Sequence, residues 1–545
     1  MNNRYLRFAI PAVFLTIIYM LLLLTILAKF VKSIGLFSIL LYTMPILIII
    51  FIVSLPKIIK GRRRKEIEDN IHFYITHLGA LATSEISRKE IMKILSERKE
   101  YRALAEETRK IYILMDKWNK NLAQACRFMA KRTPSKIFAD FLDRMAHELD
   151  SGVDFKEFIR REQKVVMNEF STLYQGKLYS IDIFKEVYVS IVISISFFAS
   201  FAIIAPFLTG LNVMLILNLI IILLILTEIG LLVYVKVVSP VDPIWQTSGE
   251  FTPVDWKIYR AFYISCILCL VLFSMIIYSV FALELFNIPI PFIVALTVTP
   301  MFIPGIISRR FENKIINRDK NAPSFMVSLG SSASVMGGNI LNALKFLTAH
   351  DFGELTEGIR SLYKRLCTRM NKKLAWKKFS IDTGSNLIYR FTDMFVEAIS
   401  LGSDPKDVAE IVSNNFIMIN SLRDRRARTV SSLIGICYGT IIGMALSLYI
   451  SYGVIDTLSK LYSTLELPRN IIGNLLYPVS GIDMAYLNIA IQFILMFHAV
   501  ISSIIVKIVD GGRWMSGLVH MVGMLWLAAV SGYVSQIVIS QLLAL

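Results

Sequence analysis

The chain has 545 residues, of which 55% are hydrophobic and only 18% are charged. This composition excludes an ordinary soluble globular protein and is typical of a protein that crosses the membrane many times. The net charge of +17 does not indicate nucleic acid, because no nucleic-acid-binding motif is present and an excess of Lys and Arg in a membrane protein first marks cytoplasmic loops. We therefore expect no nucleic acid partner.

Apolar runs long enough to cross a bilayer as helices, at about 1.5 Å per residue, recur along the chain. They cover residues 8–28, 34–55, 187–208, 211–235, 261–283, 288–307, 430–455, 484–506 and 516–543. In the polar blocks, apolar residues recur at helical spacing and strand-like alternation is scarce. The sequence predicts an all-α polytopic membrane protein with about nine transmembrane helices.

The runs and polar blocks divide the chain into predicted parts. These are a two-span hairpin at 1–56, a first cytoplasmic helical module (module 1) at 57–186, four spans in 187–307, a second cytoplasmic helical module (module 2) at 308–429 and three spans in 430–545. With both modules in the cytoplasm, the outside keeps only Lys29, Lys32, Lys460 and Arg469 of the basic residues. This bias places the N-terminus in the cytoplasm and the C-terminus outside the cell membrane.

The two modules repeat one another, which indicates that one helical unit was duplicated. Leu78-Gly79 matches Leu329-Gly330, and the segment 119–123 matches 371–375. The match continues in one register for Thr133, Phe141, Asp143, Gly152, Asp154 and Lys156 against Thr383, Phe391, Asp393, Gly402, Asp404 and Lys406.

Asp154 and Asp404 are predicted to cap a helix in each module. In both copies an acidic residue follows three positions later, and Pro405 suits the first position of a helix. A carboxylate before a helix accepts hydrogen bonds from its first free backbone N–H groups. We interpret both residues as structural caps, with catalysis as the alternative.

The segment 355–378 has the strongest charge pattern. Its apolar residues recur at helical spacing, which predicts a helix through Lys372 and a break near Asn371, and no Asp or Glu lies between Arg360 and Lys378. The basic residues on the opposite side are Arg360, Lys364, Arg365, Arg369 and Lys372. The corresponding segment of module 1 also contains Glu106, Glu107 and Asp116.

Three interpretations of this basic surface remain open: a solvated face that fixes topology, a docking face for an acidic partner, and contact with anionic lipid headgroups. Exposed ion pairs contribute about 0.2–1 kcal/mol each, and lipid attraction is about 1 kcal/mol per basic residue, so magnitude does not separate the last two. A second cluster, Arg423, Arg425, Arg426 and Arg428, directly precedes a span. We attribute it to the positive-inside rule.

No motif for catalysis or for a cofactor is found. The P-loop pattern is absent, the six histidines show no metal-ligand spacing, and the five cysteines imply no disulfide framework. The sequence therefore predicts no catalytic residue, no cofactor, no metal site and a protein that is not an enzyme.

Glu228 is the clearest ionisable residue inside an apolar run, and such residues are costly in the bilayer unless they have a function or a partner. Either it pairs with a polar neighbour in the bundle or it lines a wet cavity. A solute or proton transporter that uses Glu228 is thus an alternative function.

Several segments resemble a known family. They are Pro240 to Gln246 (PVDPIWQ), Leu344 to Gly353, Leu362 to Leu366 and Phe391 to Glu397. These segments resemble the archaellum assembly platform family FlaJ (ArlJ), within the wider superfamily of type II secretion and type IV pilus platforms (GspF/PilC/TadC-like). The similarity covers nearly the whole chain, and module 2 carries its most specific part.

The resemblance implies a platform in the archaeal cell membrane that serves motility. In that family the cytoplasmic modules engage a hexameric secretion-type ATPase (FlaI-like), whose movements drive assembly and rotation of the filament. The other implied partners are archaellin or pilin-like subunits, further archaellum motor components, the lipid membrane and a second copy in a homodimer. The platform of a non-rotating archaeal adhesive pilus or of a type II secretion-like system is the alternative. The acidic residues in module 1 favour module 2 as the docking module.

Overall fold

The computed structural model describes residues 61–209, 213–281, 289–464 and 484–543. Every regular element in these ranges is a helix, which confirms the predicted all-α class. Seven of the described helices, or helix pairs, are long and apolar enough to cross a membrane, and each overlaps one of the seven runs predicted from residue 187 onward. The two spans predicted at 8–28 and 34–55 lie outside the described residues.

The chain forms two compact units, the first of which contains the described residues 61–78 and 86–166. It is built from a helix over residues 61–82 and from α3 (Arg88–Glu97), η2 (Lys99–Tyr101), α4 (Ala103–Asp116), α5 (Leu122–Ala130), α6 (Lys136–Asp150) and the start of α7 (Phe155–Thr209). Apolar residues at helical spacing bury one face of each helix. Tyr74 lies at the centre, with its ring edge-on to Phe138 at 5.8 Å between centroids.

The second unit contains residues 79–85 and 167–545. Its polar part, module 2, consists of the C-terminal part of α11 (Phe302–Val335), α12 (Ile340–Leu347), η4 (Gly353–Leu355), α13 (Thr356–Cys367), α14 (Lys372–Thr383), α15 (Asn386–Ser400) and the start of α16 (Pro405–Thr464). The helices α11 and α16 pack closely at Gly330, where a Cβ would lie 2.3 Å from the Cβ of Ala409. Any larger residue at position 330 would force these helices apart.

The duplication is visible helix by helix. α6 and α15 both have 15 residues and begin at Lys136 and Asn386, and α7 and α16 begin at Phe155 and Pro405, so one register relates both pairs. The same register relates Asn121 and Asn371, whose side chains cap α5 and α14 by accepting from the amides of Gln124 and Leu374.

The predicted match of segment 119–123 to 371–375 is therefore displaced by two residues. The reason is the turn before each cap, because Asn119 (φ 47°) and Arg369 (φ 59°) both adopt the left-handed conformation. These two residues occupy equivalent positions, although the identical residues in the sequence match are Asn119 and Asn371.

Three membrane helices continue without a break from the polar modules. The predicted boundaries at residues 186, 307 and 429 lie inside α7, α11 and α16. The remaining membrane helices are α8 (Val213–Val238), α9 (Pro253–Phe281), α10 (Ile290–Val298) with η3 (Thr299–Met301) leading into α11, α18 (Met484–Asp510) and, after η5 (Trp514–Gly517), α19 (Leu518–Leu543). α16 has 60 residues, so at 1.5 Å per residue it is about 90 Å long. Such a helix can carry a displacement of module 2 into the membrane bundle.

Candidate functional site

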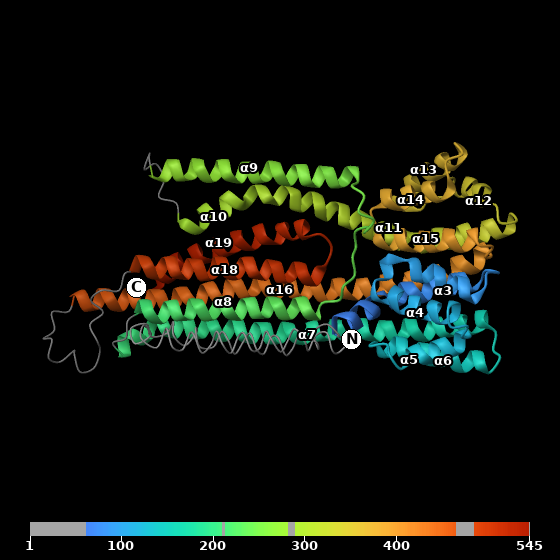
Figure 1. Cartoon of the computed structure of the whole chain (residues 1–545). Coiled ribbons are helices and arrows are strands. Elements are labelled where there is room, and N and C mark those ends of the chain that lie inside the picture. Colours follow the sequence, from blue (N-terminus) through green and yellow to red (C-terminus); the bar gives the residue numbers. More distant parts are fainter. Residues whose placement is uncertain (1–60, 210–212, 282–288, 465–483, 544–545) are drawn as a thin grey trace, which may run out of the picture. The chain divides into compact units, whose positions relative to one another are not determined.

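An extended segment of residues 239–252, here called the strap, joins α8 to α9 and has no helix of its own (Figure 1). It pairs with the turn between α14 and α15. Gln246 N donates to Gly384 O at 2.8 Å and Asn386 N donates to Ile244 O at 3.0 Å, and Trp245 and Ser385 form an isolated β-bridge. The strap thus ties module 2 to the connection between two membrane helices.

Arg423 of α16 holds the strap from one side. Its guanidinium donates to both carboxylate oxygens of Asp242 at 2.6 and 2.7 Å, to Pro243 O at 3.1 Å and to Asp319 Oδ2 at 2.7 Å. Ser385 Oγ donates to the other carboxylate oxygen of Asp319. Side-chain exposure is only 12% for Arg423, 10% for Asp242 and 2% for Asp319. Because these charges are removed from water, each depends on its partners.

A second anchor lies at Trp245. Its indole Nε1 donates to Glu312 Oε1 of α11 at 2.9 Å, and the same oxygen accepts from Arg513 N at 2.7 Å in the turn between α18 and α19. The Arg513 guanidinium stacks over the Trp245 ring at 3.9 Å and pairs with Asp255 at the start of α9. Gly512 (φ +69°) is required here, because a Cβ would lie 2.3 Å from Glu312 Oε1.

These two anchors make the strap the meeting point of α9, α11, α15, α16 and the α18–α19 turn. Among the described residues no group of His, Cys, Asp and Glu side chains could hold a metal ion. The strap's buried ion pairs and backbone pairing resist relative movement. The chemistry therefore fits mechanical coupling between module 2 and the membrane helices.

The pKa of Asp319 sets the charge of this cluster. Asp319 lies on α11 in the polar block, beyond the predicted span at 288–307. Burial raises the pKa of its carboxyl to about 6, although Arg423 and Ser385 lower it, and the nearby Asp242 carboxylate raises it further. One guanidinium faces two carboxylates, so a proton on Asp319 leaves the cluster neutral.

Asp319→Asn is therefore expected to be tolerated at neutral pH and to remove a pH dependence. Between about pH 4 and 6, folded Asp319 holds a proton that the unfolded chain has released, so its contribution to stability falls as pH rises through this window. The wild-type protein should gain thermal stability relative to Asp319→Asn as pH falls from 7 to 5. Thermal unfolding in detergent would check this, and a relative loss for the wild type would contradict it.

The basic surface predicted on one helix is divided between two. α13 ends at Cys367 rather than continuing to Lys372, and α14 begins at Lys372 after a turn. The helix ends early because Arg369 adopts the left-handed conformation (φ 59°), and the Asn371 side chain then caps α14 by accepting from Leu374 N at 3.4 Å. The break expected near Asn371 is present.

The predicted docking residues accordingly differ in their surroundings. Arg360, Lys364, Arg369 and Lys372 are exposed to solvent. Arg365 is only 27% exposed and pairs with Asp382 of α14 at 2.5 Å. It stabilises module 2 from within and is the least available of the five to a partner.

Asp154 and Asp404 stand directly before α7 and α16. The amide of Glu157 donates to Asp154 at 3.2 Å, and the amides of Lys406 and Asp407 donate to Asp404 at 2.8 and 3.2 Å. Ser334 Oγ also donates to Asp404 at 3.1 Å. Burial raises the pKa of Asp404, but these bonds outweigh it and lower the pKa below its ordinary value. The geometry is that of a helix cap.

Glu228 of α8 is enclosed in the bundle. Its carboxylate oxygen Oε1 lies 2.5 Å from Nδ1 of His498 on α18, and the side chains are 1% and 0% exposed. His498 Nε2 lies 3.2 Å from Thr440 Oγ1, and the Tyr188 ring stacks on the imidazole at 6.1 Å. Of the two interpretations of Glu228, the one that matches this arrangement is pairing with a polar neighbour in the bundle.

The sequence reasoning missed the strap anchors. In the sequence, Pro240 to Gln246 stands out through the family resemblance, and the positive-inside rule alone accounts for Arg423. Arg423 is 181 residues from Asp242 and 104 from Asp319, so no local pattern joins them. The available signal was the acidic Asp242 in a short Pro-rich connection, where a buried charge requires a partner.

Comparison with known proteins identifies the family. The family described as type II secretion system (T2SS), protein F, matches residues 74–203. A flagella accessory protein J from Methanocaldococcus jannaschii is 37% identical over 543 residues, covering 99% of this chain and 95% of that protein. Another from Methanococcus voltae is 35% identical over 546 residues, covering 99% and 97%.

This chain belongs to the flagella accessory protein J family. The membership confirms the resemblance to FlaJ that the sequence segments indicated. It also agrees with the long apolar helices of the second unit. The name of the relatives describes an accessory protein and no catalytic activity. No solved structure matches the chain.

Proposed function

We propose that this flagella accessory protein J is the membrane platform of the archaellum and couples a cytoplasmic secretion-type ATPase to filament assembly and rotation. Membership of the family supports the platform role. The observation that carries the coupling is the strap, since it leads from α8 into α9 and is held by Arg423 of α16 and, through Trp245, by Glu312 of α11. A platform must pass force from the cytoplasm into the bundle, and rigid continuous helices with buried anchors suit this task.

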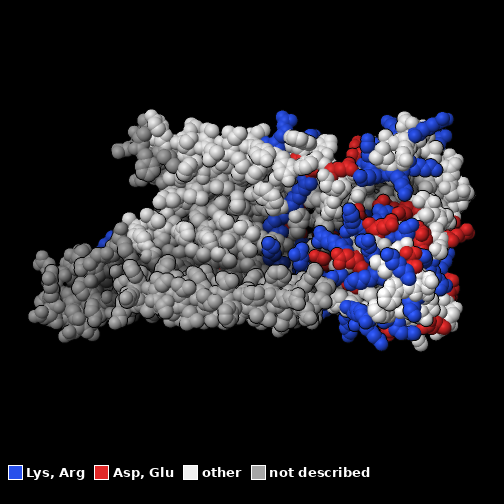
Figure 2. All heavy atoms as spheres, in the orientation of Figure 1, with Lys and Arg blue, Asp and Glu red and all other residues white. Residues whose placement is uncertain are grey.

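The proposed topology has the N-terminus and both modules in the cytoplasm and the C-terminus outside. In Figure 2, Lys and Arg side chains gather where the apolar part of the second unit meets its polar part and over module 2, and the apolar part is nearly free of them. This distribution is what the positive-inside rule predicts. The partners follow from the topology: the ATPase meets module 2, and the pilin-like subunits meet the membrane helices, in a platform we expect to be a homodimer.

The proposed ATPase docking surface lies on α12, α13 and the start of α14. Its basic residues are Arg360, Lys364, Arg369 and Lys372. Beside them, Leu341 and Phe346 of α12 are exposed, and Phe346 is 56% exposed. Arg360 reaches the C-terminal end of α12, where its Nε donates to Thr348 O at 3.4 Å. Arg360 therefore lies at the end of α12 that carries Phe346.

The duplicated module provides a comparison. α3 corresponds to α12, and its exposed residues are Arg88, Lys89 and Glu97 rather than Leu and Phe. The exposed residues of α12 thus include apolar side chains where those of α3 are all charged, and exposed apolar side chains can mark an interaction surface. An acidic partner with an apolar patch fits it, because charge steers the encounter and apolar burial supplies affinity.

Reversing Arg360, Lys364 and Lys372 to Glu together should weaken ATPase binding by at least tenfold at low salt. The reason is that attraction over a Debye length of about 10 Å becomes repulsion. Co-purification with the ATPase over a salt series measures the effect. The matched control reverses Arg109, Lys117 and Lys120, which are exposed at the α4–α5 corner of module 1. Equal binding by both triple variants would contradict the docking proposal.

An adhesive pilus or type II secretion-like platform is a second candidate, because the type II secretion family matches residues 74–203. It shares the same coupling geometry. Deletion of the gene separates them: loss of swimming with retained surface adhesion supports the archaellum, and the reverse result supports the pilus.

A further inference from the structure

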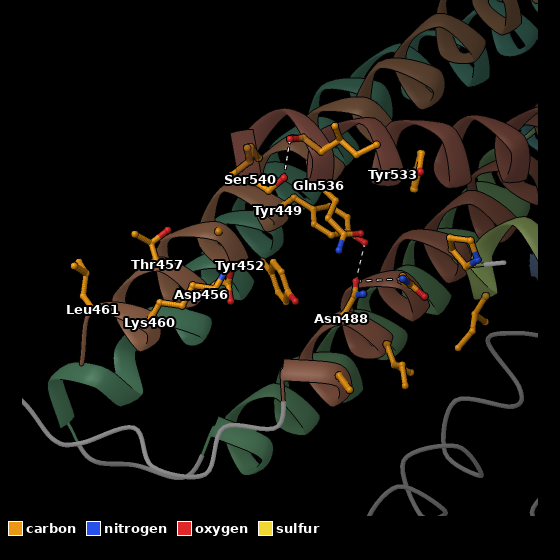
Figure 3. Close-up of a pocket in the computed structure, with 18 residues that line it drawn as sticks. Tyr449, Tyr452, Asp456, Thr457, Lys460, Leu461, Asn488, Tyr533, Gln536 and Ser540 are labelled. Carbon is orange, nitrogen blue, oxygen red and sulfur yellow. Dashed lines mark hydrogen bonds and ion pairs between the residues drawn. The ribbon is translucent and has the colours of Figure 1, made fainter. Parts of the chain in front are cut away.

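The strongest unassigned feature is a cavity of about 900 Å³ among α16, α18 and α19, at the end of these helices remote from module 2. It lies entirely within the second unit. Figure 3 shows Tyr449, Asn488, Tyr533 and Gln536 around this space, with Asp456 and Lys460 farther along α16. In the proposed topology the cavity lies at the outer face of the membrane. A volume of this size falls in the range of ligand-binding pockets.

Each helix contributes polar residues at helical spacing to this cavity. α16 contributes Tyr449, Tyr452 and Asp456, α18 contributes Asn488 and Gln492, and α19 contributes Tyr533, Gln536 and Ser540. Spacings of three and four place the residues of one helix on one face. Three polar helix faces therefore converge on one space.

The side-chain oxygen of Gln492 accepts no hydrogen bond among the described residues. Gln492 is 9% exposed, and its amide nitrogen donates to Asn488 Oδ1 at 3.2 Å. Its carbonyl oxygen is buried without a hydrogen bond. A buried acceptor left unsatisfied costs about 1–3 kcal/mol. Gln492 also lines the cavity, so a rotation of its amide toward the cavity would let a hydroxyl or amide donor of a ligand remove this cost.

The charge of the lining limits the ligand. Asp456 and Lys460 are the charged residues in the described part of the lining, and they pair with each other at 2.6 Å. Among these described residues, an anionic phosphate would meet carboxamides, phenols and a cation that is already paired. A neutral group with many hydroxyls instead finds acceptors, donors and aromatic rings, the combination on which sugar rings form hydrogen bonds and stack.

The rest of the lining indicates where that group comes from. Ile290, Ile489 and Ile537 also border the cavity and are 50%, 50% and 37% exposed. A polar wall next to exposed aliphatic side chains suits a ligand with a polar head and a hydrocarbon chain. Tyr residues concentrate at the membrane interface, where lipid headgroups lie.

We propose that this cavity binds the neutral sugar headgroup of a membrane glycolipid, with Gln492, Asn488 and Gln536 holding its hydroxyl groups and Tyr452 and Tyr533 beside its rings. The inference does not depend on the proposed coupling to an ATPase. It gives the platform a lipid-specific anchor at the end of the long helix α16. A soluble sugar lacks the chain that the isoleucines would contact.

The test is native mass spectrometry of the purified full-length protein titrated with digalactosyl diacylglycerol, phosphatidylglycerol, phosphatidylcholine or a soluble digalactoside. We expect the glycolipid to bind at least tenfold more tightly than the other three. Gln492→Leu with Gln536→Leu should abolish this preference, and Gln536→Leu alone, at a half-buried position, should weaken it several-fold. The control Asn218→Leu removes a carboxamide that bonds Tyr486 outside the cavity and should change nothing.

A photocrosslinking residue at position 537 distinguishes the occupant in cells. An adduct with the mass of a glycolipid supports the proposal. Crosslinking to a polypeptide instead, equal binding of the glycolipid and the phospholipids, or binding unaffected by the Gln substitutions would each overturn it.

Discussion

Arg423→Met is expected to destabilise the second unit by about 3–5 kcal/mol and to release the strap. The substitution keeps an unbranched apolar stem but leaves the carboxylates of Asp242 and Asp319 buried without their guanidinium, and breaking a buried ion pair by removing one partner has a cost of this order. The thermal unfolding temperature of the detergent-solubilised protein should fall markedly. Hydrogen exchange should be faster at the amides of Gln246 and Asn386, which pair the strap with the α14–α15 turn.

Arg425→Met is the matched control. Arg425 belongs to the same basic cluster and precedes the same span, but it donates to Gln175 Oε1 at 2.7 Å on an exposed surface. Both variants lose one positive charge at nearly the same distance from the membrane, so any effect on topology is shared. We expect Arg425→Met to stay within about 0.5 kcal/mol of the wild type, as exposed substitutions usually do. Equal losses in the two variants would mean that Arg423 acts only through topology.

The functional consequence separates stability from coupling. Arg423→Lys keeps the charge but cannot contact both carboxylates with a planar fork, so it should retain most of the stability and bind the ATPase normally. If the strap transmits force, filament assembly by this variant should be reduced although the platform is present at normal levels. Normal assembly would show that the anchor is structural alone.

Much of the fold was predictable because it is encoded locally. Apolar runs of about 20 residues give membrane helices, and a described helix overlaps each of the seven runs from residue 187 onward. The duplication was found from a few identities. Its exact register near residue 371 was not, because it depends on the backbone conformation of Asn119 and Arg369, which their side chains do not reveal.

The site could not be predicted in the same way. Arg423 precedes a span and satisfies the positive-inside rule, which is a sufficient explanation until the fold brings Asp242 and Asp319 to it. Likewise, Glu228 was recognisable as costly in the bilayer, but its partner His498 is 270 residues away. Composition identifies charged residues whose position in the chain is costly, and only the tertiary structure shows which partners offset that cost.

The pair of Glu228 and His498 leads to the second large effect. Glu228→Leu alone, and His498→Leu alone, should each destabilise the bundle by about 2–4 kcal/mol, because the remaining polar group stays buried without its partner. Glu228→Leu with His498→Leu should return to within about 1 kcal/mol of the wild type, since apolar residues of similar volume replace a buried pair with little loss. A double-mutant cycle of thermal unfolding measures the coupling.

The double variant also decides between the platform and the transporter. If Glu228 and His498 only hold α8 against α18, the stable double variant should assemble filaments and support swimming. If instead they carry protons or solute, it should be folded and inactive, and the wild-type protein should conduct in liposomes. Both side chains are fully enclosed, at 1% and 0% exposure, so neither lines an aqueous route through the described bundle. We therefore expect cells that carry the double variant to swim.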